Sequence, residues 1–222
     1  MADLPDGFFE WQLTQRRKNL EAVLNHTRVA VFDMLALHDP IVATLDEQSL
    51  RVNMASKGVG LVLADEGEMQ DFVDEANRLI EKTYLTSEKD TFDERINLLL
   101  DSIYVPLDSN GDWKAHFDRA CLGTLEMYGG TTYANILANG RASLMYSTLK
   151  AGGYFSQQFH ADVIVHAPES LFYQYFVALH DIYHIPPQKK ADRTERFPCA
   201  YEFRITEVWD KAPGPAAGTR IA

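Results

Sequence analysis

The sequence predicts an α+β fold: an antiparallel β-sheet of six or a similar number of strands, with flanking helices and a central helical segment. Three observations predict it. Short apolar runs with a period of two occur before and after the centre of the chain, turn-forming residues join several of them, and the central segment has the period of amphipathic helices. Because 46% of the 222 residues are hydrophobic, the chain can bury one core, and a single domain over residues 1–222 is expected.

The N-terminal part of the chain predicts two helices. Apolar residues such as Trp11 and Leu20 recur among Lys and Arg over residues 8–24, which is typical of a surface helix with one packed face. A second helical segment, residues 29–37, is predicted to end before Pro40, because the residue that precedes a proline is pushed out of the α-helical region.

The next segments predict a β-hairpin followed by a helical segment. Residues 41–45 are rich in β-branched side chains and residues 50–54 alternate with period two, with a turn-like Asp-Glu-Gln-Ser between them. From residue 66 to residue 117 apolar side chains recur at helical spacing instead. We therefore expect two amphipathic helices within residues 66–117, and a shorter third helix around residues 113–117.

The C-terminal half returns to strand-like patterns. Predicted strands cover residues 119–127, 141–146, the surroundings of Tyr154, 159–166 and 200–208, and a predicted helix covers residues 168–184. The residues alone leave two alternatives near Asn139-Gly140: a two-residue hairpin turn, or the end of a helix that begins at Thr132. Residues 213–222, rich in Pro, Gly and Ala, predict a flexible tail.

Charge and composition exclude several classes of protein. The 32 acidic and 21 basic residues give a formal net charge of −11, the wrong sign for a protein that wraps nucleic acid. No apolar run reaches the roughly 18 residues of a membrane-spanning helix, so no membrane partner is expected. Two cysteines, Cys121 and Cys199, are too few for a disulfide framework, which favours a cytoplasmic location and buried thiols.

One run carries a family resemblance. Residues 124–146, TLEMYGGTTYANILANGRASLMY, resemble the third strand, phosphate loop, short helix and fourth strand of the pyridoxamine 5′-phosphate oxidase-like proteins, the FMN-binding split barrels. Residues 42–58 are similar to the first two strands of that family, and residues 203–208 to its closing strand. The resemblance covers residues 28–65 and 118–212 and favours the helix over the hairpin at Asn139-Gly140.

The resemblance implies a fold, a cofactor and an activity. It implies an antiparallel split β-barrel with the insertion 66–117, and a homodimer whose two FMN sites are each built from both chains. The implied function is that of an FMN-dependent oxidoreductase acting on a small-molecule substrate. Two alternatives stay open: a non-catalytic split barrel that binds flavin or haem, and a partner-binding protein that has lost the cofactor.

The candidate residues for the phosphate of FMN lie in the turn before the short helix. Glycines such as Gly130 let the backbone approach an anion, N–H groups at a helix N-terminus point toward it, and the hydroxyls of Thr131 and Thr132 add donors. Lys57 adds a positive charge near the same phosphate and Ser56 a further donor. Members of the family usually have Arg or Lys in this turn, so the pocket of this chain is less basic.

The resemblance places four candidates along the rest of the cofactor. Asn53 and Ser56 are expected beside the ring or the ribityl edge of the flavin. Gln157 and Gln158 occupy the strand from which family members often reach its polar edge. No residue with the role of a catalytic acid or base is indicated.

Histidine patterns offer a weaker hypothesis of a metal site. His180 and His184 have the i, i+4 spacing that can hold a metal ion, but they lie away from the centre of an apolar helical stripe and are predicted to be exposed or half-exposed. His160 and Asp162 have the His-x-Asp form of iron sites, without the distant third histidine such sites need. No metal site is therefore predicted, and haem, which would need a histidine ligand, remains the alternative to FMN.

Overall fold

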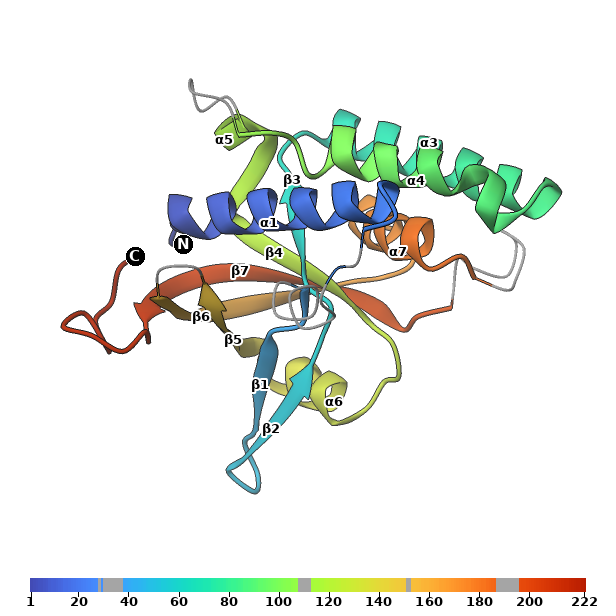
Figure 1. The fold of residues 1–222 in the computed structure, drawn as a ribbon. Helices are drawn as coiled ribbons and strands as arrows, with labels where there is room; N and C mark the ends of the chain where they lie inside the picture. Colours follow the sequence, from blue (N-terminus) through green and yellow to red (C-terminus); the bar gives the residue numbers. More distant parts are fainter. Residues whose placement is uncertain (28, 30–37, 108–112, 151–152, 187–195) are drawn as a thin grey trace.

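The structure, a computed structural model, describes residues 1–27, 29, 38–107, 113–150, 153–186 and 196–222 (Figure 1). The helix predicted over residues 29–37 lies outside the described residues, except for residue 29.

In the described part of the chain, seven strands form one antiparallel sheet in the order β2-β1-β5-β6-β7-β4-β3. The strands are β1 (Ile41–Asp46), β2 (Arg51–Ser56), β3 (Gly60–Leu63), β4 (Phe117–Glu126), β5 (Arg141–Lys150), β6 (Gly153–His166) and β7 (Cys199–Asp210). The predicted α+β class with an antiparallel sheet is confirmed. Sequence patterns missed β3, because all four of its residues are buried and no alternation marks it.

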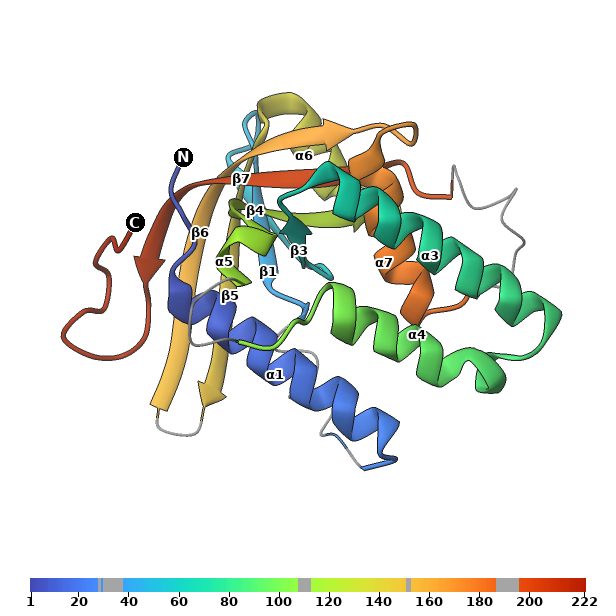
Figure 2. The ribbon, with the colours of Figure 1, turned by 90° about the horizontal axis from the view of Figure 1, so that it is seen from above.

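The helices lie in two places relative to the sheet. They are α1 (Asp6–Leu24), α3 (Glu66–Leu85), α4 (Glu88–Ser102), α5 (Trp113–His116), α6 (Thr131–Asn139) and α7 (Leu171–Tyr183). Helices α1, α3, α4 and α7 lie together on one side of the sheet, whereas α6 lies beside the β1–β2 hairpin (Figures 1 and 2). Each of these helices falls within a few residues of a predicted segment.

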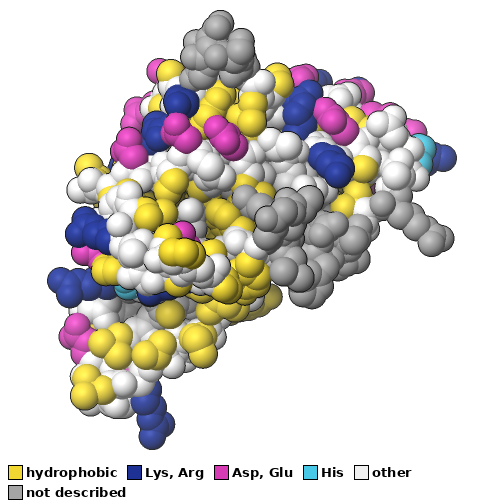
Figure 3. Space-filling view, turned by 60° about the vertical axis from the view of Figure 1, so that its left-hand side comes forward, with side chains coloured by type: hydrophobic (Ala, Val, Ile, Leu, Met, Phe, Trp, Pro, Cys, Tyr) yellow, Lys and Arg dark blue, Asp and Glu magenta, His cyan; other side chains and the backbone are white. Residues whose placement is uncertain are grey.

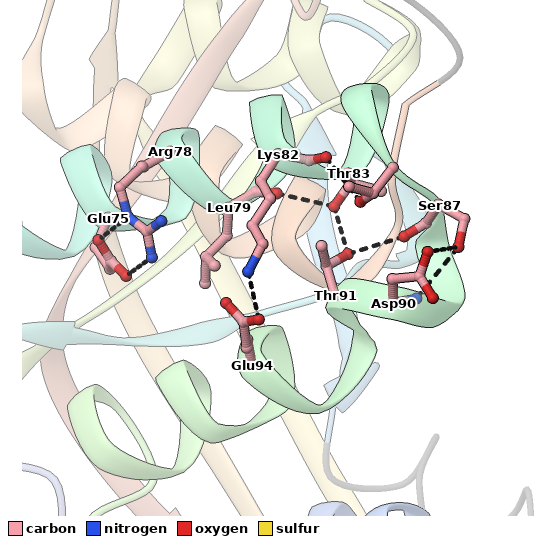
Figure 4. Close-up of polar contacts among 10 residues, drawn as sticks. Glu75, Arg78, Leu79, Lys82, Thr83, Ser87, Asp90, Thr91 and Glu94 are labelled. Carbon is pink, nitrogen blue, oxygen red and sulfur yellow. Dashed lines mark hydrogen bonds and ion pairs between the residues drawn. The ribbon is translucent and has the colours of Figure 1, made fainter.

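The helical insertion is part of the hydrophobic core. Phe72 of α3 and Ile96 of α4 are buried, and the ring of Phe72 packs edge-on against Tyr175 of α7 at a centroid distance of 5.6 Å. Polar contacts also join the two helices of the insertion, including a 2.6 Å hydrogen bond between the hydroxyls of Thr83 and Thr91 (Figure 4). The insertion therefore completes the core on the helical side of the sheet.

The ambiguous segment is helical, as the family resemblance favoured. Gly140 has a φ of 64° and donates its N–H to the carbonyl of Ile136, which ends α6 in a left-handed residue. Asn135 attaches the helix to β1, because its side-chain amide donates to Thr44 Oγ1 at 3.1 Å. These contacts end α6 at Gly140 and hold the helix against β1.

The last ten residues, predicted to be a flexible tail, fold back along β7. The N–H of Val208 donates to the carbonyl of Ala222 at 2.9 Å, and Trp209 forms an isolated antiparallel bridge with Arg220. Among the described residues, no helix combines the length and the apolarity needed to cross a membrane.

Candidate functional site

A cavity of about 890 Å³ lies where β2, β4 and the start of α6 meet helices α1, α4 and α7. This volume falls in the range of small-molecule sites, about 300–1,000 Å³. Apolar side chains from four of these elements form part of the wall: Leu20, Leu99, Leu125, Phe176 and Leu179. The space can therefore hold a ligand with a flat, apolar body.

Two groups of polar residues line this cavity. We refer to the first as the turn group: Asn53, Ser56, Lys57, Glu126, Gly130, Thr131 and Thr132. We refer to the second as the histidine group: Arg16, Asn19, His38, Tyr104, His180 and His184.

The structure brings six of the eight predicted cofactor residues together. Asn53, Ser56, Lys57, Gly130, Thr131 and Thr132 all line the cavity. Gln157 and Gln158 do not line it, since they lie within β6 and pair with β5 on one side and β7 on the other. The cofactor-binding role of all eight residues remains a prediction.

The N-terminus of α6 is open toward the cavity. Gly130 is the N-cap residue and gives no side-chain cap, and a Cβ added to it would meet no atom within 4 Å. The first N–H groups of a helix have no acceptor within the helix, so they are available to an anion. Asn53 connects β2 to this helix, because its side-chain amide donates to Thr132 Oγ1 at 2.9 Å.

A buried carboxylate occupies the centre of the turn group. Glu126 Oε2 accepts hydrogen bonds from Lys57 Nζ at 2.7 Å and from the hydroxyl of Tyr201 at 2.9 Å. Glu126 Oε1 accepts the N–H groups of Tyr128 and Gly129, each at 3.1 Å. Burial alone would raise the pKa of Glu126, but the hydrogen bonds from Lys57 and from the backbone outweigh it and hold this pKa below its usual value.

Arg16 organises the histidine group from α1. Its guanidinium donates to the hydroxyl of Tyr104 at 2.8 Å and to the carbonyl of Val59 at 3.0 Å, and lies 3.1 Å from His38 Nδ1. Because the guanidinium can only donate, His38 Nδ1 accepts and the imidazole is neutral. His38 is exposed to the cavity, but the protein atoms around its ring displace much of the surrounding water, and this desolvation, followed by the charge of Arg16, lowers the pKa of His38 from 6.5 to about 3.

The other two histidines come from α7. Their ring centroids are 5.2 Å apart, and His180 Nδ1 lies 2.8 Å from an oxygen of the fully buried Asp181, which also pairs with Arg196. Partial desolvation of its ring lowers the pKa of His184, and the neighbouring His180 lowers it further. His180 is half-buried and His184 exposed, as predicted.

Several residues of the site were missed by sequence reasoning. The only sequence signal of Glu126 is an acidic residue three positions before the Gly-Gly pair, and nothing local connects Arg16 with His38. No group of three or more His, Cys, Asp or Glu residues suited to a metal ion is found in the described part of the chain. Cys121 and Cys199 are buried and free, as expected.

Comparisons with known proteins find similarity only among solved structures. No protein-family model matches the sequence, and no curated protein matches it. HupZ of Group A Streptococcus is similar with 11% identity and a TM-score of 0.42, over 86% of this chain and 100% of HupZ. An FMN-binding protein from Syntrophomonas wolfei subsp. wolfei is similar with 12% identity and a TM-score of 0.39, over 90% of both chains.

Proposed function

We propose that this protein binds FMN in the cavity and acts as a flavin-dependent oxidoreductase on a small molecule. One observation supports the proposal most: six predicted cofactor residues, from segments more than seventy positions apart in the sequence, line one cavity of about 890 Å³. That volume accommodates a flavin, and the open N-terminus of α6 supplies donors that suit an anionic group.

Each part of the cavity has a role in this proposal. Thr131, Thr132 and the first N–H groups of α6 hold the phosphate, with Lys57 beside them. Asn53 and Ser56 hold the ribityl chain or the ring edge, and the apolar wall receives the ring. A bound flavin supplies the hydride and electron chemistry, while the protein binds it, orients it and excludes water.

We also propose that the protein is a homodimer, in the cytoplasm. Four large apolar residues on the two strands of the β1–β2 hairpin are exposed, from 40% for Leu45 to 70% for Met54. The other two are Ile41 and Val52, and Val52 lies directly opposite Leu45 in the hairpin. On the face of the molecule that Figure 3 shows, apolar side chains gather in the lower part, at the level of β1 and β2. A second copy that covers this surface would also bring its own residues near the turn group.

Haem is the second candidate ligand, because neutral histidines line the same cavity. His38 and His184 both have lowered pKa values, and the neutral imidazole is the form that ligates haem iron.

An absorption spectrum of protein purified without added cofactor distinguishes the two ligands. We expect flavin bands, release of FMN on denaturation, bleaching of the bands by NADH or NADPH, and a mass of two chains in light scattering. A Soret band would favour haem instead. A colourless protein that also fails to quench the fluorescence of added FMN contradicts the proposal.

Variants test the placement of the phosphate. Thr132→Ala should weaken FMN binding about tenfold, since a hydrogen bond to a charged group contributes roughly 1.5–3 kcal/mol. Lys57→Ala should also weaken binding, because it leaves the negative charge of Glu126 uncompensated near the phosphate. Thr27→Ala, at an exposed position after α1, is the matched control. An FMN affinity of Thr132→Ala and Lys57→Ala equal to that of the parent protein would show that the phosphate lies elsewhere.

A further inference from the structure

The turn before α6 already contains an anion of its own. The carboxylate of Glu126 receives four hydrogen bonds: from Lys57, from Tyr201, and from the backbone of Tyr128 and Gly129. Two of these donors are N–H groups of the loop that leads into α6, and the ammonium of Lys57 is a third. These are the kinds of group that a phosphate would otherwise engage.

Burial makes the pairing of Glu126 with Lys57 strong. The side chains of Lys57 and Glu126 are only 11% and 3% exposed, and their charged atoms lie 2.7 Å apart. Charges in contact attract each other more in a site of low dielectric constant than in water, so the pair is not easily separated. Among the described residues that line the cavity, Lys57 is the only lysine, and its charge is compensated by Glu126.

The groups left for a terminal phosphate are therefore mostly uncharged. They are the first N–H groups of α6 and the hydroxyls of Thr131 and Thr132, one of which already accepts a hydrogen bond from Asn53. Arg16, the other basic residue of the cavity wall, belongs to the histidine group on α1. A dianion gains less from such donors than from an uncompensated lysine.

We infer that Glu126 is a specificity-determining residue, which makes the affinity of the cavity for a flavin depend little on the terminal phosphate. Riboflavin, which ends in a neutral hydroxyl, then binds at most about tenfold more weakly than FMN. This inference rests on the proposed flavin site and specifies which flavins that site accepts.

The test compares the dissociation constants of FMN and riboflavin, measured by quenching of flavin fluorescence. The parent protein should bind FMN at most about tenfold more tightly than riboflavin. Glu126→Gln keeps the size of the side chain and an oxygen for the two backbone N–H groups, but it leaves the charge of Lys57 uncompensated. The preference for FMN over riboflavin should then rise about tenfold or more, the gain of one hydrogen bond to a charged group.

Two further variants keep the test specific. In the double variant Lys57→Met, Glu126→Gln both charges are absent, and the preference should return to the parent value. Glu202→Gln is the matched control, because Glu202 is also a buried, paired glutamate on a strand but lies outside the cavity wall. Its preference should equal that of the parent.

The outcomes separate this inference from the proposed function. If both flavins bind but Glu126→Gln leaves the preference within threefold of the parent, the inference is wrong and the flavin site stands. If Glu126→Gln does not fold, the double variant decides: a preference tenfold below that of the parent would show that Lys57 does hold the phosphate. If neither the parent nor Glu126→Gln binds either flavin, the proposed function is wrong and the inference is wrong with it.

Discussion

The two polar groups of the cavity are encoded in different ways. The whole turn group comes from two short segments, residues 53–57 and 126–132, each of which has a recognisable local pattern. The histidine group is assembled from α1, from residue 38, from the end of the insertion and from α7; its Arg16 and Tyr104 lie 88 positions apart but are bonded at 2.8 Å. The comparison shows that one wall of this cavity depends on local sequence and the other on packing.

The largest effect is expected on the free energy of unfolding, from a substitution in the core of the insertion, which supplies part of the histidine group. Ile96 of α4 is fully buried, and the same helix presents Leu99 to the cavity. Ile96→Ala should lower the free energy of unfolding by about 2–5 kcal/mol, the usual cost of a cavity in a core. Urea denaturation measures this free energy.

Leu85→Ala is the control for that measurement, because Leu85 lies at the end of α3 and is 87% exposed. Its effect should stay within about 0.5 kcal/mol. Equal effects of the two variants would show that the insertion does not contribute to the core. The histidine group would then not depend on the packing of the insertion, and the contrast between the two polar groups would not hold.

The sequence predicted those helices and strands whose apolar residues recur with a regular period. The period of two found the hairpin β1–β2, and the helical period found α3 and α4. It missed β3, because a strand buried on both faces shows no alternation. It also divided β6 in two, at a segment where apolar and polar residues do not alternate regularly.

The candidate site could be predicted only where its residues are neighbours in sequence. The Gly-Gly-Thr-Thr turn is such a case, and so is the segment that contains Lys57. The pairing of Lys57 with Glu126 could not be predicted, since it joins positions 69 apart, one just after the end of β2 and the other at the end of β4, and these strands are not neighbours in the sheet. For His38 the same holds: its neutral state follows from Arg16, which lies 22 positions earlier.

A pH titration sharpens the description of the histidine group. His38 is neutral in the folded protein, with a pKa lowered from 6.5 to about 3, so between these values the unfolded chain binds a proton that the folded chain does not. Stability should therefore fall as the pH decreases from about 6.5 toward 3. His38→Asn, whose side-chain oxygen can accept the hydrogen bond from Arg16, should show a shallower fall. Equal slopes of the two proteins, measured by urea denaturation over this range, would show that His38 is charged in the folded state.

The smallest expected effect tests whether the turn group is set by local backbone conformation. Gly129 has a φ of 65°, in the left-handed region, whereas its neighbour Gly130 has a φ of −86°. Gly129→Ala should cost about 1–2 kcal/mol of stability, because a Cβ is disfavoured in that region. Gly130→Ala should cost less, since an added Cβ meets no atom within 4 Å. Denaturation curves of the two variants test this difference directly.

Equal costs would mean that the shape of this turn is held by the contacts of Glu126 with the backbone, rather than by the conformational freedom of Gly129. The turn group would then also depend on packing between distant segments.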